Sequence, residues 1–263
     1  MHRRLGINDY LYAQPVFQGL KQPRDDPQFE LVRDVPAQLA LKLRQRQLDG
    51  AFLSPIDYAK DYASYLLLPK ACAASDCESG TVGLFFNEHL RAIRTLAVDA
   101  TSSSEIVLAH LVLKEKYDIT PQLVPVSASL EIALGKADAA LLVGDASVAL
   151  QGRINKIDLV DEWTDLTGLP FVHGIWAARE DALSAGEIDM IVESGRNGSS
   201  SIGREYDGDR QLYLQDFRYE LDDEIIQGLT EFFRMAYYHG ILKDIPEIRF
   251  HGEESPDQPV PDA

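Results

Sequence analysis

Short apolar runs alternate with amphipathic stretches along the chain, a pattern that predicts an α/β protein with mostly parallel strands. Val, Leu and Phe are frequent in the runs of the first third, which predict strands at residues 4–7, 29–33, 51–54, 65–68, 71–75 and 81–86. A second series of predicted strands covers residues 95–98, 122–126, 139–143 and 171–178.

The stretches between these runs carry helix signals. Pro15 suits the first turn of a short helix within residues 10–19. Leucines at positions 39, 43 and 48 form one apolar face of a helix predicted over residues 35–48. Further helices are predicted over residues 56–60, 105–116, 129–134, 180–194 and 221–240.

The series of strands and helices restarts at residue 95, which predicts two lobes. We expect the first lobe to contain residues 1–94 and 178–251, and the second to contain residues 95–177. Residues 252–263 hold three prolines and no apolar cluster, which predicts a disordered tail. Two lobes joined by chain crossings leave a cleft between them, and such clefts are preferred ligand sites.

The charge balance excludes some partners. The 263 residues include 25 Lys and Arg against 42 Asp and Glu, a net charge of −17. This is the wrong sign for binding a nucleic acid backbone or an anionic membrane surface, so we expect neither partner. A small anion is still possible, because a few backbone amides at a helix start can hold one in a protein of any net charge.

Cysteine usage and the first residues predict a cytoplasmic location. The two cysteines, Cys72 and Cys77, cannot form a disulfide framework, which favours a reducing compartment. The N-terminal residues run into polar Asn8 and Asp9 without the apolar segment that secretion requires. The sequence also contains no apolar run of about 18 residues, the length of a membrane span.

Two loops at strand ends are candidate ligand sites. Thr101, Ser102, Ser103 and Ser104 stand between a predicted strand and a predicted helix, where hydroxyls can cap free amides or the amides can receive an anion. Gly144 and Asp145 hold the same position after the strand at 139–143. Both interpretations, a plain helix cap and a ligand contact, stay open for both loops.

Motifs for several other kinds of chemistry are missing. The six histidines have no spacing that suits a zinc site, so we expect no metal. Serine hydrolase, P-loop and dinucleotide-binding motifs are not present. His173 interrupts an apolar strand and could face the cleft or be a structural histidine. These observations leave two classes open, a binding protein and an enzyme without a cofactor.

Several blocks, taken in order, resemble the chorismate dehydratase family of the futalosine route to menaquinone. The matching blocks are 6–15 (GINDYLYAQP), 48–59 (LDGAFLSPIDYA), 67–82 (LLPKACAASDCESGTV), 138–148 (DAALLVGDASV), 161–176 (DEWTDLTGLPFVHGIW) and 236–250 (AYYHGILKDIPEIRF). The resemblance implies the two-lobed fold of periplasmic solute-binding proteins. It also implies loss of water from chorismate to give 3-(1-carboxyvinyloxy)benzoate, with no cofactor because the ring becomes aromatic. A carboxylate of the substrate can act as the base in the family's proposed mechanism, so the protein would mainly orient it.

The resemblance also implies site residues, and this chain departs from the family pattern at some of them. Tyr12 stands where the family has the asparagine that serves proton transfer, and Thr81 stands where it has a serine. The family's Ser-x-Thr-Ser falls on residues 102–105, which ends the match on Glu105. The implied catalytic residues are Tyr12 and Thr81, and the implied substrate contacts are Ser54, Ser102, Ser103, Ser104, Gly144 and Asp145.

Two alternatives accompany the dehydratase hypothesis. A divergent family member could bind or transform another small aromatic or cyclic carboxylate in the same cleft. The third hypothesis is the sister activity of the family, cleavage of a cyclised futalosine derivative. All three predict a small-molecule carboxylate as the partner.

Overall fold

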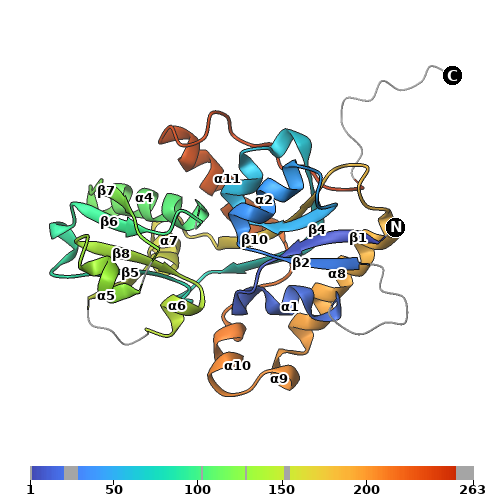
Figure 1. The fold of residues 1–263 in the computed structure, drawn as a ribbon, viewed down its shortest axis with the longest axis horizontal. Coiled ribbons are helices and arrows are strands. Elements are labelled where there is room, and N and C mark those ends of the chain that lie inside the picture. Colours follow the sequence, from blue (N-terminus) through green and yellow to red (C-terminus); the bar gives the residue numbers. More distant parts are fainter. Residues whose placement is uncertain (1, 21–28, 102, 128, 151–154, 253–263) are drawn as a thin grey trace.

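The structure is a computed structural model that describes residues 2–20, 29–101, 103–127, 129–150 and 155–252. Its strands form two separate five-stranded sheets, which lie side by side in Figure 1 with helices packed around each. The α/β class and the two-lobed architecture predicted from the apolar runs are confirmed. Of the predicted disordered tail, all but Gly252 lies outside the described residues.

The first sheet has the strand order β2-β1-β3-β10-β4. Its strands are β1 (Arg3–Ile7), β2 (Phe29–Arg33), β3 (Gly50–Leu53), β4 (Leu66–Ser75) and β10 (Phe171–Ala178). β1 pairs in parallel with β2 and β3, whereas β10 pairs antiparallel with β3 and β4. The predicted strands at 65–68 and 71–75 are one continuous strand, which pairs with β10 on both sides of a register shift near Lys70, where φ is 60°.

The second sheet has the strand order β7-β6-β8-β5-β9. Its strands are β5 (Val82–Phe86), β6 (Thr95–Val98), β7 (Gln122–Pro125), β8 (Ala139–Val143) and β9 (Lys156–Asp158). β6 pairs in parallel with β7 and β8, and β5 pairs antiparallel with β8 and β9.

Both sheets are therefore mixed, and four of the five strands in each run in the same direction, which agrees with the prediction of mostly parallel strands. In each sheet one strand, β10 or β5, runs against its two neighbours. These are the first strands that the chain forms after it passes from one sheet to the other. Apolar runs identify a buried strand but carry no information on its direction.

The passages between the sheets lie earlier in the chain than the predicted lobe boundaries. Residues 76–81 connect β4 to β5, so β5 belongs to the second sheet although it falls within the predicted first lobe, 1–94. β10 belongs to the first sheet although it falls within the predicted second lobe, 95–177. The sequence order of strands does not reveal which sheet a strand joins.

Eleven α-helices connect and cover the strands in the part of the chain that the structure describes. They are α1 (Gln14–Phe17), α2 (Pro36–Arg44), α3 (Pro55–Ala59), α4 (Ser103–Tyr117), α5 (Leu130–Leu134), α6 (Asp145–Val148), α7 (Leu159–Thr167), α8 (Ala185–Ser200), α9 (Ile202–Glu205), α10 (Gly208–Gln215) and α11 (Asp223–Tyr238). Short 3-10 helices are η1 (Leu11–Ala13), η2 (Gln18–Leu20), η3 (Tyr62–Ser64) and η4 (Leu90–Ala92).

Local sequence explains several helix starts. The Ser184 hydroxyl accepts a hydrogen bond from the Glu187 amide, and the Glu187 carboxylate accepts one from the Ser184 amide. This capping box begins α8 later than the predicted residue 180. The Asp222 side chain caps α11 by accepting a hydrogen bond from the amide of Ile225. The segment 202–215, which carried no helix prediction, contains α9 and α10.

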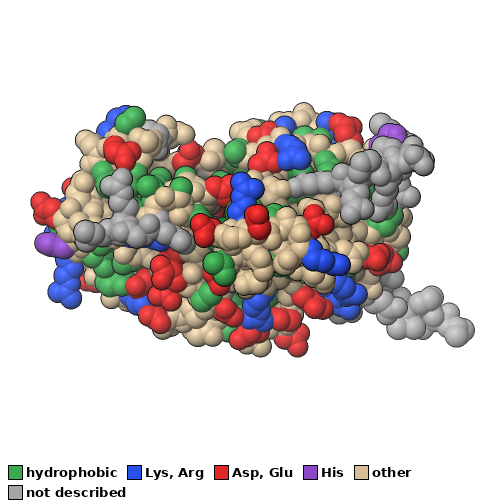
Figure 2. Space-filling model, turned by 90° about the horizontal axis from the view of Figure 1, so that it is seen from below, with side chains coloured by type: hydrophobic (Ala, Val, Ile, Leu, Met, Phe, Trp, Pro, Cys, Tyr) green, Lys and Arg blue, Asp and Glu red, His purple; other side chains and the backbone are tan. Residues whose placement is uncertain are grey.

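The acidic excess is spread over the surface. Figure 2 shows Asp and Glu side chains scattered over much of one face, with Lys and Arg interspersed among them. Many of these charges are paired, as Arg218 is with Asp76, Asp222 and Glu224. Within the described residues, no helix is both long enough and apolar enough to cross a bilayer.

Candidate functional site

The candidate site lies where the two lobes meet, and hydrogen bonds join segments from both. The amide of Leu11 in η1 donates to Asp145 Oδ1 at 3.1 Å. The amide of Ile56 in α3 donates to Ser104 Oγ of α4 at 2.9 Å. These bonds tie the starts of helices in the first lobe to the starts of helices in the second.

Tyr12 lies at the centre of an aromatic cluster in this region. Its ring stacks on Tyr10 and Phe217, with ring centroids 5.4 and 5.7 Å away, and tilts against His173 at 5.2 Å. The residue is 1% exposed. Burial raises the pKa of Tyr12 well above its usual range, and the negative charge of Glu105 adds to the rise. Tyr12 therefore fills space at the lobe interface as a neutral phenol.

Thr81 joins the same cluster through Tyr213 of α10. Thr81 Oγ1 and the Tyr213 hydroxyl are 2.8 Å apart, and both residues are buried. The carbonyl of Thr81 accepts a hydrogen bond from the Gly144 amide at 2.8 Å. The predicted residues Tyr12, Thr81, Gly144 and Asp145 thus come together, although they are distant in sequence.

Replacing Thr81 by valine should lower the free energy of unfolding by about 1–3 kcal/mol, because the buried Tyr213 hydroxyl would lose its partner. Thr81→Ser keeps the hydroxyl and should cost less. Urea denaturation of the two variants measures the difference. Equal stability of the Val and Ser variants would show that the hydrogen bond contributes nothing.

Most of the predicted serine contacts serve as helix caps or bridges. Ser54 caps α3, and its hydroxyl donates to Asp57 Oδ2 at 2.9 Å. Ser103 accepts a hydrogen bond from Lys60 Nζ at 3.5 Å, and Ser104 accepts the Ile56 amide described above. Ser102 lies outside the described residues.

Gly144 and Asp145 lie on the side of the candidate site that the second lobe forms. Gly144 has a φ of 64°, and a Cβ there would lie 2.5 Å from the Tyr10 ring, so only glycine suits this close approach. The exposed side chain of Asp145 stands between two cavities of about 450 and 560 Å³. Asp9 lines both, Arg33 lines the first and Arg210 lines the second. A third cavity of about 360 Å³ lies between Tyr10 and the loop at 99–101.

Glu105 is buried, which the sequence patterns did not predict. It lies in the first turn of α4, is 5% exposed, and burial raises its pKa to about 7, with the charge of Asp57 as a smaller cause. No ion pair among the described residues includes it. A charged residue directly before the apolar run of this helix is the sequence signal that could have identified it.

His173 is neutral, and one of its two ring nitrogens has a hydrogen-bond partner among the described residues. Its Nε2 lies 2.8 Å from Ser75 Oγ, whereas Nδ1 is buried without a partner among the described residues. Burial lowers the pKa of His173 to about 3. The ring contacts Tyr12, Phe171 and Phe217. His173 therefore supports the aromatic cluster and brings one unpaired nitrogen to it.

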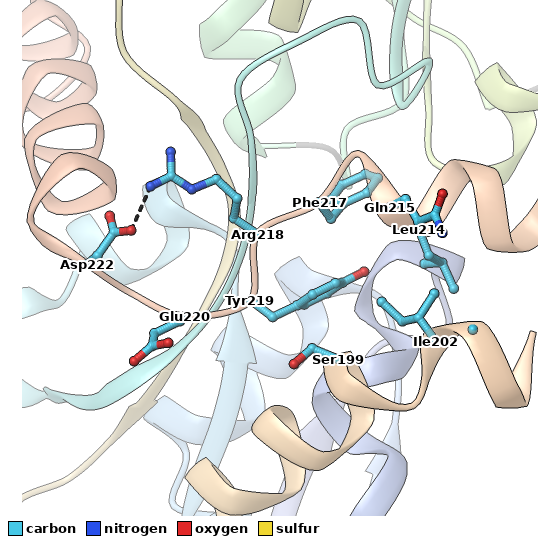
Figure 3. A pocket seen from close by; sticks show the side chains of 10 residues that line it. Ser199, Ile202, Leu214, Gln215, Phe217, Arg218, Tyr219, Glu220 and Asp222 are labelled. Atoms are coloured by element: carbon cyan, nitrogen blue, oxygen red, sulfur yellow. Dashed lines mark hydrogen bonds and ion pairs between the residues drawn. The ribbon is translucent and has the colours of Figure 1, made fainter.

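A further cavity of about 500 Å³ lies behind the aromatic cluster, on the first lobe (Figure 3). Tyr219 lines it and donates a hydrogen bond from its hydroxyl to the Tyr12 carbonyl at 3.0 Å. Arg218 also lines it, but its guanidinium is held by Asp222 at 2.6 Å and Glu224 at 2.7 Å. The carboxylates of Asp222 and Glu224 therefore neutralise the arginine to which an anionic ligand in this cavity would bind.

Two α/β lobes with a ligand-sized cleft between them define a periplasmic-binding-protein-like fold. The periplasmic aliphatic sulphonate binding protein of Escherichia coli has this architecture, with a TM-score of 0.65, 13% identity, and coverage of 94% of this chain and 95% of that one. A protein of Archaeoglobus fulgidus is similar with a TM-score of 0.72 and 19% identity, over 91% of this chain and 98% of that one.

The sequence comparisons identify the family within this fold. The model of a family described as menaquinone biosynthesis matches residues 3–238, so the chain belongs to that family. A chorismate dehydratase of Thermus thermophilus is 26% identical over 257 residues, which cover 87% of this chain and 93% of that protein. The resemblance noted in the sequence blocks is thereby confirmed.

Proposed function

We propose that this protein is a carbon–oxygen lyase that converts chorismate to 3-(1-carboxyvinyloxy)benzoate in the lobe interface. The family match over residues 3–238 is the observation that carries this proposal. The relative from Thermus thermophilus, named a chorismate dehydratase, supports the choice of substrate. The futalosine route and a cytoplasmic location belong to the same proposal, and the free thiols of Cys72 and Cys77 are compatible with a reducing compartment.

The chemistry requires little besides orientation and one or two proton transfers. Dehydration breaks a ring C–H bond and the C–O bond of the hydroxyl, and the electron pair of the C–H bond completes the aromatic ring. The cavities beside Asp145, of about 450 and 560 Å³, are in the range that small-molecule ligands occupy. The half-buried tyrosines Tyr10 and Tyr206 line these cavities and offer hydroxyl groups that can donate protons.

The charges around the cleft favour a second candidate, in which the ligand is a cyclic carboxylate with less negative charge than chorismate. Asp9, Asp99 and Asp145 line the cavities, and the Arg33 guanidinium is already paired with Asp9. The Tyr12 ring also occupies space that a compact amide side chain would leave open. A divergent family member of this kind would bind without dehydrating chorismate.

Incubation of the purified protein with chorismate distinguishes the two candidates. We expect the wild type to form the enolpyruvyl benzoate, detected by chromatography and mass spectrometry. Tyr12→Asn should change the rate, whereas Tyr238→Asn, made at a tyrosine that is 68% exposed on α11, should not. Product from Tyr12→Asn alone would favour a lineage that lost the reaction. No product from either, with tight binding of another cyclic carboxylate, would favour the second candidate.

A further inference from the structure

Arg210 lines the cavity of about 560 Å³ beside Asp145, and this cavity lies between the two lobes. The residues that line it come from three segments of the chain, within residues 9–14, 145–149 and 206–210. The first of these segments belongs to the first lobe, and the second begins α6 of the second lobe. A ligand in this cavity would therefore contact both lobes and the start of α10.

Helix α10 connects Arg210 to the residues predicted to act in catalysis. Arg210 and Tyr213 are three positions apart in this helix, and residues at that spacing lie on the same helix face. The Tyr213 hydroxyl lies 2.8 Å from Thr81 Oγ1, and α10 packs on η1, the helix that carries Tyr12. The face of α10 that carries Arg210 is thus directed to the region where Tyr12 and Thr81 come together.

Three arginines line the four cavities described above, and Arg210 differs from the other two in its partners. The guanidinium of Arg33 is paired with Asp9. That of Arg218 is paired with Asp222 at 2.6 Å and Glu224 at 2.7 Å. In the part of the chain that the structure describes, no ion pair includes Arg210. Arg210 is therefore the arginine whose charge is available to a ligand.

The acidic groups that share the cavity with Arg210 already have protein partners. Asp145 Oδ1 accepts a hydrogen bond from the Leu11 amide at 3.1 Å, and Asp9 is paired with Arg33. In a protein with a net charge of −17, an anionic ligand needs a local positive charge to offset repulsion. A guanidinium provides that charge and two parallel N–H donors that match the two oxygens of a carboxylate.

We propose that Arg210 binds a carboxylate of the substrate in this cavity and so determines the preference of the site for an anionic ligand. The choice of chorismate as that substrate rests on the proposed function. Arg210 would hold the substrate equally well before and during the reaction, because it takes no part in the proton transfers. Its loss should therefore raise KM and leave kcat nearly unchanged.

The test compares Arg210→Gln with Arg204→Gln, a matched change at an exposed arginine of α9 that does not line this cavity. We expect Arg210→Gln to raise KM for chorismate by about tenfold or more, while Arg204→Gln should keep the wild-type KM and kcat. Arg210→Lys keeps the charge but loses the paired N–H groups, so its KM should lie between the two. Added salt should raise the KM of the wild type more than that of Arg210→Gln.

Titration calorimetry with benzoate distinguishes a failure of this proposal from a failure of the proposed function. If the wild type forms product and Arg210→Gln has an unchanged KM, the role of Arg210 alone is overturned, as it is if only kcat falls. A wild type that forms no product overturns the dehydration. Benzoate bound about tenfold more weakly by Arg210→Gln than by this wild type would still support the carboxylate contact. Equal binding by both, or no binding, would overturn that contact as well.

Discussion

Gly198→Ala should lower the free energy of unfolding by about 3 kcal/mol, because the added methyl group would collide with main chain. A Cβ at this position would lie 1.8 Å from the carbonyl oxygen of Pro15, a distance that no side-chain rotation can relieve. Pro15 belongs to α1, which packs on α8 and directly follows η1, the helix that carries Tyr12. Separating α8 from α1 would therefore also shift Tyr12, and we expect weaker ligand binding in the same variant.

Gly186→Ala is the matched control in the same helix. A Cβ there meets nothing within 4 Å, so the change should be neutral or stabilise the protein by up to about 1 kcal/mol through helix propensity. Urea denaturation followed by circular dichroism measures both variants. If Gly198→Ala proved as stable as Gly186→Ala, the close contact between α8 and α1 would be wrong.

Glu105→Gln should make the protein more stable at pH 8 by about 3 kcal/mol, while the two proteins should differ little at pH 4.5. The pKa of Glu105 is about 7 in the folded protein and has the ordinary value of 4.5 in the unfolded chain. The unfolded chain therefore releases this proton at lower pH than the folded protein does. The contribution of the neutral carboxyl is complete below pH 4.5 and is lost as pH rises to about 7.

Glutamine has nearly the same shape and cannot ionise, so its variant should lack this loss of stability. Glu115→Gln serves as the control, because Glu115 is 43% exposed and pairs with His239, the residue after α11, and such a pair contributes at most about 1 kcal/mol. Urea denaturation at pH 4.5, 6 and 8 gives the three free energies for each protein. A wild type and a Glu105→Gln variant with parallel pH profiles would refute the raised pKa.

The predictions of strands and helices are correct where the local sequence pattern is sufficient to define the element. The strands at 95–98, 139–143 and 171–178 have the predicted bounds, because mainly apolar runs between turns mark a buried strand. The partly exposed strand at 29–33 also has the predicted bounds. Errors occurred where one residue changes the local conformation, as Lys70 does within β4, or where a cap delays a helix, as Ser184 does for α8.

The sequence also indicated the candidate site in part. Tyr12 and Thr81 were identified from the family resemblance and the loop at 144–145 from its position after a predicted strand, and the structure brings them together. Whether they act in catalysis remains a prediction. Glu105 was noted as a departure from the family pattern, but its proximity to Tyr12, 93 positions earlier, depends on how the two lobes close.

The sequence alone determined the α/β class, the two lobes and the positions of most strands, because apolar periodicity is a local property of the chain. It also determined the membership of the family, because the blocks that resemble the family are short continuous segments. Only the tertiary structure decided the direction of β5 and β10, the sheet that each one joins, and the burial of Glu105 beside Tyr12. Pairing and burial depend on residues far apart in the chain. The pKa of a carboxyl group depends on its surroundings in space, which no local pattern specifies.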